Sequence, residues 1–265
     1  MFLVIDIGNT NTVFATYMSS NKNFKLLFSF RVSTNLNRTS DEYSFLINHS
    51  FNMHNFNLSE LSGVSIASVV PEVMNNIEVY VKNTLKVPLE TIDFNKLEID
   101  INIENPIEAG QDRLINAYAI KKMKLDPAII IDFGTATTFD VVGKGGAYLG
   151  GIIAPGINLS VESLYKATSR LPKVSVKTLN NEKETLVGKN TISAIESGVF
   201  WGYVCMIDGL IQKLKKYHKN SKIIATGGLS QIFKNNIKSI DIIEQQLTIK
   251  GLAYFYLSQE KKYEI

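Results

Sequence analysis

One short motif occurs twice in this chain, and this repeat constrains the fold more than any other feature of the sequence. The first copy reads VIDIGNTNTVF over residues 4–14, and the second reads IIDFGTATTFD over residues 130–140. With Asp6 aligned to Asp132, the matched pairs are Gly8 and Gly134, Asn11 and Thr137, and Thr12 and Thr138. A fold with two similar halves is therefore expected.

The residue types in each copy predict a buried strand, a tight turn and a second strand. The apolar, β-branched run favours a buried strand. The glycine allows a turn with positive φ and lets a ligand approach the backbone. The Asn and Thr side chains and the N–H groups of the turn form a donor-rich concave surface of the kind that binds phosphate. The Asp is suited to hold a cation, or the water shell of a metal ion, that bridges to the phosphate.

A single copy of the motif has a simpler interpretation. Asp, Gly and Asn are ordinary turn residues, so one copy alone could be a plain β-hairpin. Two copies separated by about half of a 265-residue chain favour another account. We expect two similar domains, each offering a phosphate loop to a shared cleft.

The composition is that of a globular protein. Apolar residues make up 45% of the chain and charged residues 20%, so the chain can bury a sizeable core. The net charge is only +3, and the lysine clusters around residues 121–124 and 213–216 are not interleaved with stacking aromatic residues. Nucleic-acid binding is therefore not expected. The single cysteine, Cys205, excludes an intrachain disulfide and is too little for a thiolate metal site.

We expect no secretory signal at the start of this sequence. Met1 runs directly into an apolar strand, without a basic segment or a small-residue cleavage site. No apolar run approaches the ~18 residues that are needed to span a bilayer. We expect a soluble, cytoplasmic protein that does not bind membranes.

The first half of the chain predicts three strands followed by alternating helices and strands. Alternation indicates strands over residues 2–6, 12–18 and 24–32. Thr39 and Glu42 form a predicted capping box at the start of a helix. A strand over 64–70 ends at Pro71, which begins another helix. Strands over 89–93 and 99–103 close this half.

The second half repeats the pattern. Asp112 and Arg113 lie just ahead of a helix or in its first turn, and then come the strand over 128–133 and the second loop. The longest helical pattern covers residues 191–217, and the strand over 223–226 ends in Gly227 and Gly228 before another helix. A glycine pair in that position suits a nucleoside pressed against bare backbone. Asp112 lies at a helix start, where it is either a functional carboxylate or an N-cap, and the residues alone leave both open.

Taken together, these motifs resemble a known family. Duplicated Asp-apolar-Gly loops with a late Gly-Gly turn resemble the actin, sugar-kinase and Hsp70 superfamily of ATP phosphotransferases. More narrowly, the chain resembles type III pantothenate kinases, and the shared motifs follow one another in family order over nearly the whole chain. They are residues 6–10, 68–71, 110–113, 132–138, 150–156, 188–191 and 225–229.

The resemblance implies a fold and a reaction. The fold would be α/β, with duplicated actin-like (ribonuclease H-like) ATPase domains over residues 1–116 and 117–265. Each domain would have a mixed sheet with three leading antiparallel strands and flanking helices. The reaction would be ATP-dependent phosphorylation of pantothenate to 4'-phosphopantothenate, the first step of coenzyme A biosynthesis. The protein would be a homodimer with substrate sites near the interface.

The resemblance also implies a role for individual residues. Asp112 would be the catalytic base, and Asp6 would lie near the Mg²⁺ that accompanies ATP. Asp132 would hold the monovalent cation, K⁺ or NH₄⁺, that the family requires. The implied pantothenate-site residues are Gly110, Gln111, Asp112, Arg113 and Thr191. The implied ATP-site residues are Asp6, Ile7, Gly8, Asn9, Thr10, Asn11, Thr12, Val13, Thr135, Gly227 and Gly228.

Two positions depart from the family pattern. Many members have Ala where this chain has Gln111, and many have a Tyr where this chain has Ile103. Both departures bear on substrate affinity or orientation, whereas Asp112 and both loops are retained. The alternatives are a kinase for another small hydroxyl or acid acceptor, a non-catalytic regulatory relative, and an actin-like filament protein. The last would need longer insertions than this chain has room for.

Overall fold

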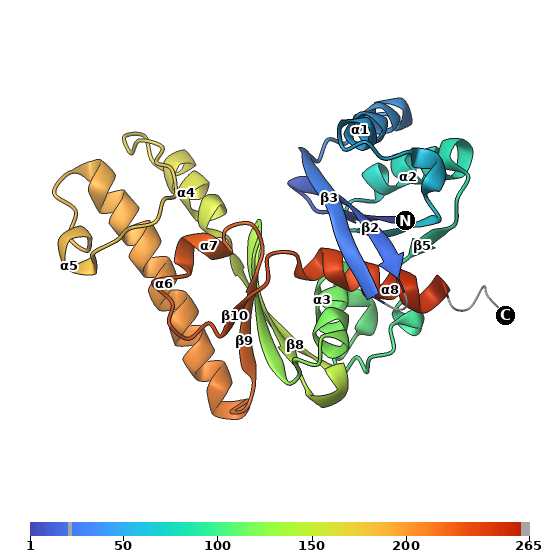
Figure 1. The fold of residues 1–265 in the computed structure, drawn as a ribbon. Coiled ribbons are helices and arrows are strands. Elements are labelled where there is room, and N and C mark those ends of the chain that lie inside the picture. Colours follow the sequence, from blue (N-terminus) through green and yellow to red (C-terminus); the bar gives the residue numbers. More distant parts are fainter. Residues whose placement is uncertain (21–22, 261–265) are drawn as a thin grey trace. The chain divides into compact units, whose positions relative to one another are not determined.

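The computed structural model describes residues 1–20 and 23–260, which form two compact units. The first unit contains Met1–Ile99, Glu104–Met123 and the segment that begins at Leu247, and the second contains Asp100–Ile103 and Lys124–Gln246 (Figure 1). This division differs from the predicted boundary after residue 116. Two helices, one following residue 110 and one following residue 246, pack with the first sheet.

The first unit is built on a five-stranded mixed sheet with the order β3-β2-β1-β4-β5. Its strands are β1 (Phe2–Ile7), β2 (Asn11–Ser20), β3 (Asn23–Ser33), β4 (Gly63–Ser68) and β5 (Leu89–Thr91). The pairs β1–β2 and β2–β3 are antiparallel, whereas β1–β4 and β4–β5 are parallel. The three leading antiparallel strands predicted from the sequence are confirmed.

The second unit repeats this topology. Its strands are β6 (Ala128–Phe133), β7 (Ala136–Val142), β8 (Tyr148–Pro155), β9 (Lys222–Thr226) and β10 (Ile242–Ile243), in the order β10-β9-β6-β7-β8. The parallel and antiparallel pairings match those of the first sheet strand for strand. Even the burial pattern of the central strands is the same, because β1 and β6 are buried throughout except at the half-buried Asp6 and Asp132.

Four long helices cover the two faces of the first sheet. They are α1 (Ser40–Met53), α2 (Pro71–Tyr80), α3 (Gln111–Lys122) and α8 (Leu247–Glu260). The predicted capping box of Thr39 and Glu42 is present at α1. The helices α1 and α2 join the core cluster on the face that contains Leu3 and Ile5. On the opposite face Phe2 stacks on Tyr256 of α8, with 4.5 Å between ring centroids.

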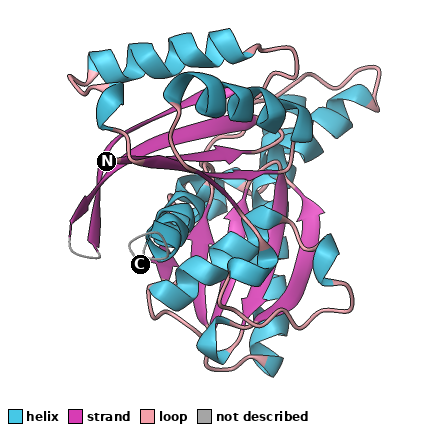
Figure 2. Ribbon diagram, turned by 90° about the vertical axis from the view of Figure 1, so that its right-hand side faces the viewer, coloured by secondary structure: helices cyan, strands magenta, loops and turns pink. Residues whose placement is uncertain are grey.

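The helices of the second unit are α4 (Ile157–Lys166), α5 (Glu182–Thr185), α6 (Thr191–Tyr217) and α7 (Ser230–Phe233). Helices lie against the strands of each sheet (Figure 2). The core of this unit lies between α6 and the sheet face of Ile129, Ile131 and Phe133. Shorter helical turns of the chain lie at 58–60, 81–85, 94–96, 106–108 and 144–146.

The helix α6 is long and apolar enough to cross a membrane, by length and composition alone. The expectation that no segment reaches that length is therefore wrong for residues 191–217. In the structure Phe200, Val204 and Ile207 of α6 are instead buried in the core of the second unit. The apolar composition of this helix is explained in part by that packing.

The strand predicted over residues 99–103 is also wrong. Only Ile101 forms an isolated bridge, and its partner is Tyr148 at the start of β8. Tyr148 N–H donates to Asp100 O at 2.8 Å, and Asn102 N–H donates to Tyr148 O at 2.8 Å. The segment therefore belongs to the second unit and does not close the first sheet.

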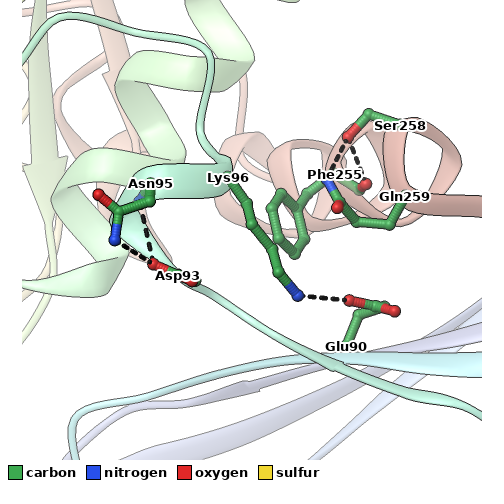
Figure 3. A network of polar contacts seen from close by, with 7 residues as sticks. All are labelled: Glu90, Asp93, Asn95, Lys96, Phe255, Ser258 and Gln259. Carbon is green, nitrogen blue, oxygen red and sulfur yellow. Dashed lines mark hydrogen bonds and ion pairs between the residues drawn. The ribbon is translucent and has the colours of Figure 1, made fainter. Parts of the chain in front are cut away.

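An ion pair links β5, at one edge of the first sheet, to the chain segment that follows it (Figure 3). Glu90 on β5 is buried, and its carboxylate accepts a bond from Lys96 Nζ at 3.3 Å. Between them Asp93 caps a short helical turn by accepting a bond from Asn95 N–H at 3.0 Å. These contacts fix the segment after β5, on which the first turn of α3 is anchored.

Candidate active site

The first hairpin, residues 6–13, is the candidate phosphate hairpin of the first unit and joins β1 to β2 through the three residues Gly8, Asn9 and Thr10. Gly8 N–H donates to Asn11 O at 3.0 Å, which closes the turn. Thr34 supports it from outside: its Oγ1 donates to Gly8 O at 2.7 Å, and its N–H donates to Thr10 O at 2.9 Å. These carbonyl oxygens, which would repel a phosphate, are therefore engaged within the protein.

The second hairpin, residues 132–138, is the candidate phosphate hairpin of the second unit, and its turn is one residue shorter. Only Gly134 and Thr135 lie between β6 and β7, and Gly134 N–H donates to Ala136 O at 3.1 Å. Strand register pairs Ile7 with Thr12 and Phe133 with Thr137. The equivalent of Thr12 is therefore Thr137, and the sequence alignment of Thr12 with Thr138 is wrong by one residue because it allowed no gap.

Neither hairpin uses its glycine for a left-handed turn, so that expectation is wrong. Among the described residues, the glycines with positive φ are Gly145, Gly146, Gly150 and Gly227. At Gly8 the reason is space, because a Cβ there would lie 3.2 Å from Asn11 O. At Gly134 the corresponding distance to Ala136 O is 3.4 Å, which is an ordinary contact.

Two other glycines press against the second hairpin. A Cβ on Gly227 would lie 2.4 Å from Asp132 Oδ1 and 2.7 Å from Phe133 O, and the residue has φ of +86°. A Cβ on Gly156, which precedes α4, would lie 2.1 Å from Thr135 O. The hairpin is thus enclosed by main chain from the β9–α7 turn and from the end of β8. The Gly227-Gly228 turn closes by a bond from Ser230 Oγ to Gly227 O at 2.8 Å.

Asp112 lies in the first turn of α3, with Gly110 as the N-cap residue. The interpretation of Asp112 as an N-cap is therefore wrong. Its Oδ1 accepts a bond from Arg113 N–H at 2.8 Å. A Cβ on Gly110 would lie 2.5 Å from that oxygen, so the glycine gives the carboxylate room.

Gln111 anchors the start of α3 to the sheet. Its Oε1 accepts a bond from Ser68 N–H at the end of β4, at 3.1 Å, and its Nε2 donates to Ile92 O after β5, at 3.4 Å. An Ala in this position, as in many family members, could make neither bond. The side chain therefore joins α3 to the carboxyl ends of two strands, and a contact with substrate stays a prediction.

Thr191 begins α6 and lies in a cavity of about 940 Å³ between α4 and α6, which we call the α4–α6 cavity. The cavity exists because small residues occupy one face of α6 at intervals of four, namely Ala194, Gly198 and Gly202. Asn190 caps the helix and accepts a bond from Ser193 N–H at 2.9 Å. Ile103, the second departure from the family pattern, lies 3.4 Å from the position of a Cβ on Gly150.

Sequence reasoning missed two residues that support the hairpins. Thr34 follows β3, far from the first motif, and nothing in its local sequence marks it. Tyr203 lies within α6 and contacts Thr137, and no motif in its local sequence marks that contact. Gly156, at the end of the bend over residues 150–156, packs closely against the second hairpin.

The described residues show no cluster of three His, Cys, Asp or Glu side chains that could hold a metal ion. Asp132 carboxylate and Phe133 carbonyl oxygens do lie beside one another against Gly227. Carboxylate and carbonyl oxygens suit a hard cation, which here would share its coordination with a ligand's phosphates.

Fold and site define a duplicated α/β protein of the actin-like ATPase fold, the fold of sugar kinases. A solved Listeria monocytogenes structure, described as a candidate N-acetylmannosamine kinase, is similar with a TM-score of 0.55, 11% identity, and coverage of 98% of this chain and 99% of that one. That likeness concerns the fold alone.

Sequence comparison is more specific. The family model described as type III pantothenate kinase matches residues 2–213. A type III pantothenate kinase from Caulobacter vibrioides is 40% identical over 258 residues, which are 97% of each chain. One from an Exiguobacterium species is 38% identical over 262 residues, 98% of this chain and 100% of the relative. The chain belongs to the type III pantothenate kinase family.

Replacing Gly227 with Ala is expected to disturb the second hairpin in two ways. The left-handed φ costs about 1–2 kcal/mol for a residue with a side chain, and the methyl group collides with Asp132. We expect nucleotide affinity to fall by about tenfold or more, measured by calorimetry with ADP. Gly145→Ala is the control, because Gly145 has φ of +72° but open space around it. If both variants bound ADP like the wild type, Gly227 would have no role at the loop.

Proposed function

We propose that this chain transfers the γ-phosphoryl group of ATP to the terminal hydroxyl of pantothenate and so forms 4'-phosphopantothenate, the first step of coenzyme A biosynthesis. The observation that carries the proposal is full-length similarity to type III pantothenate kinases, and Asp6, Asp112 and Asp132 are present in the motifs that carry the resemblance. Phosphoryl transfer depends mainly on positioning and on neutralising charge, which loops, cations and an Arg supply. Because the reaction uses ATP, we place it in the cytoplasm.

In the first unit, residues 6–13 hold phosphate oxygens and α3 supplies the base. Asp112 accepts the proton of the pantothenate hydroxyl as that oxygen attacks the γ-phosphorus of ATP and ADP leaves, and Arg113 lies beside Asp112 in the same turn. Gly110 leaves the carboxylate room, and Gln111 fixes the helix start to the sheet. The anchored helix restricts the base to a narrow range of positions, which general-base catalysis requires.

In the second unit, residues 132–135 bind phosphates and Gly227 and Gly228 bind the nucleoside. Asp132 and Phe133 O would offer oxygen ligands to a monovalent cation, K⁺ or NH₄⁺, and Asp6 at the end of β1 would hold Mg²⁺ through its water shell. The cations, when bound, offset phosphate charge that no Walker-type lysine offsets in this sequence. The absence of a three-residue metal cluster among the described residues suits ions held largely through phosphates and water.

The direct test is ADP release from Mg-ATP in K⁺ buffer, with and without pantothenate. Pantothenate-dependent release, with 4'-phosphopantothenate identified by mass spectrometry, is the expected result. A folded protein that released ADP only with a different hydroxyl or acid acceptor would be another kinase of the same fold. One that released none with any acceptor would be a non-catalytic relative.

Substituting Asp112 with Asn is expected to lower kcat by at least ~100-fold, because loss of a general base typically costs 10²–10⁴ in rate. The amide oxygen of Asn can still accept the bond from Arg113 N–H, so the local structure should persist. ADP affinity is therefore expected to stay near that of the wild type. Turnover close to the wild-type value would remove Asp112 from the base role.

Activity is expected to depend on the monovalent cation. Turnover in Na⁺ alone should be far below turnover in K⁺ or NH₄⁺, because the smaller Na⁺ fits oxygen ligands spaced for a larger ion less well. Rates at equal ionic strength, compared for the wild type and Asp132→Asn, provide the measurement. Equal wild-type rates in all three salts would argue against a cation at Asp132.

The α4–α6 cavity is the proposed place for part of pantothenate, next to a surface for a second copy of this chain. Thr191 and the exposed Leu164 line the cavity, and the same two helices expose further large apolar side chains, including Leu159, Tyr165 and Ile192. A patch of this kind on a soluble protein marks an interaction site. Light scattering on the 29.6 kDa chain would distinguish a homodimer from a monomer.

A matched pair of glycine variants tests the cavity. Gly202 and Gly209 both lie inside α6 with open space around them, but only Gly202 lines the cavity. Replacing either with Ala should stabilise the helix by up to ~1 kcal/mol. Only Gly202→Ala adds a methyl group to the cavity, so we expect only that variant to raise the KM for pantothenate. An unchanged KM in Gly202→Ala would mean that pantothenate does not bind in this cavity.

A further inference from the structure

Each phosphate hairpin contains a buried threonine at the same register position, Thr12 in the first unit and Thr137 in the second. Each threonine hydroxyl is hydrogen-bonded to a side chain from outside its hairpin. For Thr12 the partner is Thr34 Oγ1, at 3.0 Å, and Thr34 in turn donates to Gly8 O. For Thr137 the partner is the Tyr203 hydroxyl on α6. In both units a hydrogen bond from another segment therefore supports the same hairpin position, but the partner side chains differ.

The partner in the second unit connects the hairpin to a different region. Tyr203 is 6% exposed, and it lines the α4–α6 cavity along with Thr191, Gly198 and Gly202 of the same helix. One side chain therefore lines the cavity and also holds the strand that follows the phosphate turn. Thr34, which follows β3 directly, does not line this cavity.

The electrostatic surroundings of Tyr203 support this connection. Burial raises the pKa of the Tyr203 phenol, and the negative charge of Asp132 raises it further. Hydrogen bonds with Thr137 and with the backbone of Ile157 act the other way. The Tyr203 hydroxyl therefore joins α6 to β7 through Thr137, and the Tyr203 side chain lines the cavity together with Ile157 of α4.

We propose that Tyr203 is a positioning residue that connects the α4–α6 cavity to the second phosphate hairpin, so that a ligand in the cavity and a nucleotide on the hairpin favour the same arrangement of α6. The ligand of the cavity rests on the proposed function, but the contact with the hairpin does not. Coupling of this kind is reciprocal, so each ligand should tighten the binding of the other.

The first arm of the test uses ADP alone and is independent of any acceptor. We expect Tyr203→Phe and Thr137→Val each to weaken ADP binding by about tenfold, and the double variant to be no weaker than either one. Two groups that act through one bond are non-additive in such a cycle. Ser239→Ala is the control: it removes another hydroxyl that is bonded to α6, at 2.6 Å from Asp208, and neither residue lines the cavity. Additive losses, or no loss in Tyr203→Phe, would overturn the positioning role.

The second arm adds pantothenate. In the wild type and in Ser239→Ala, saturating pantothenate should tighten ADP binding, and in Tyr203→Phe this gain should disappear while the variant keeps its fold by circular dichroism. A gain that persists in Tyr203→Phe, or a wild type that binds pantothenate without any gain, would overturn the coupling. A wild type that neither binds nor phosphorylates pantothenate would instead contradict the proposed function, and the ADP cycle would still decide the role of Tyr203.

Discussion

The close approach of Gly227 to Asp132 is the constraint on which the second half of this site depends. A carboxylate at the end of a buried central strand has lost much of its water, and it needs polar partners or a counter-ion. The turn after β9 reaches it only as bare main chain, because any Cβ at Gly227 would lie 2.4 Å from Asp132 Oδ1. Gly156 encloses the hairpin in the same way from the end of β8. The packing of main chain against the second hairpin therefore determines the shape of this part of the site.

Much of the fold follows from the repeated motif. Two copies of one hairpin led to two sheets of equal topology, and the capping box at Thr39 and the limits of α6 were predicted from local signals. The features that the sequence did not predict have a common cause. Thr34 and Tyr203 support the hairpins through contacts between residues distant in the chain, which no local pattern encodes. The extended segment near residue 101 pairs with Tyr148 for the same reason.

Gly8 shows that a predicted need for glycine can be correct although the predicted reason, a positive φ, is not. Gly8 and Gly134 were expected to adopt positive φ, yet that conformation occurs at Gly227, in the turn that faces the second hairpin. A sequence identifies where glycine is needed, but conformation and lack of space both produce that need. Gln111 has a structural role that its motif did not suggest: its amide bonds the backbone at Ser68 and Ile92, and the predicted contact with a ligand stays a prediction.

The course of the chain through the two units has a consequence for how the protein is made. The first unit takes its sheet and α1 to α3 from the first half of the chain, but α8, which stacks Tyr256 on Phe2, comes from the end. The second unit lies almost entirely between these parts in sequence. During synthesis from the N-terminus, the first sheet therefore emerges with one apolar face covered only by α3, and α8 completes that cover after the second unit has been translated. The unit that is started first is the one that is completed last.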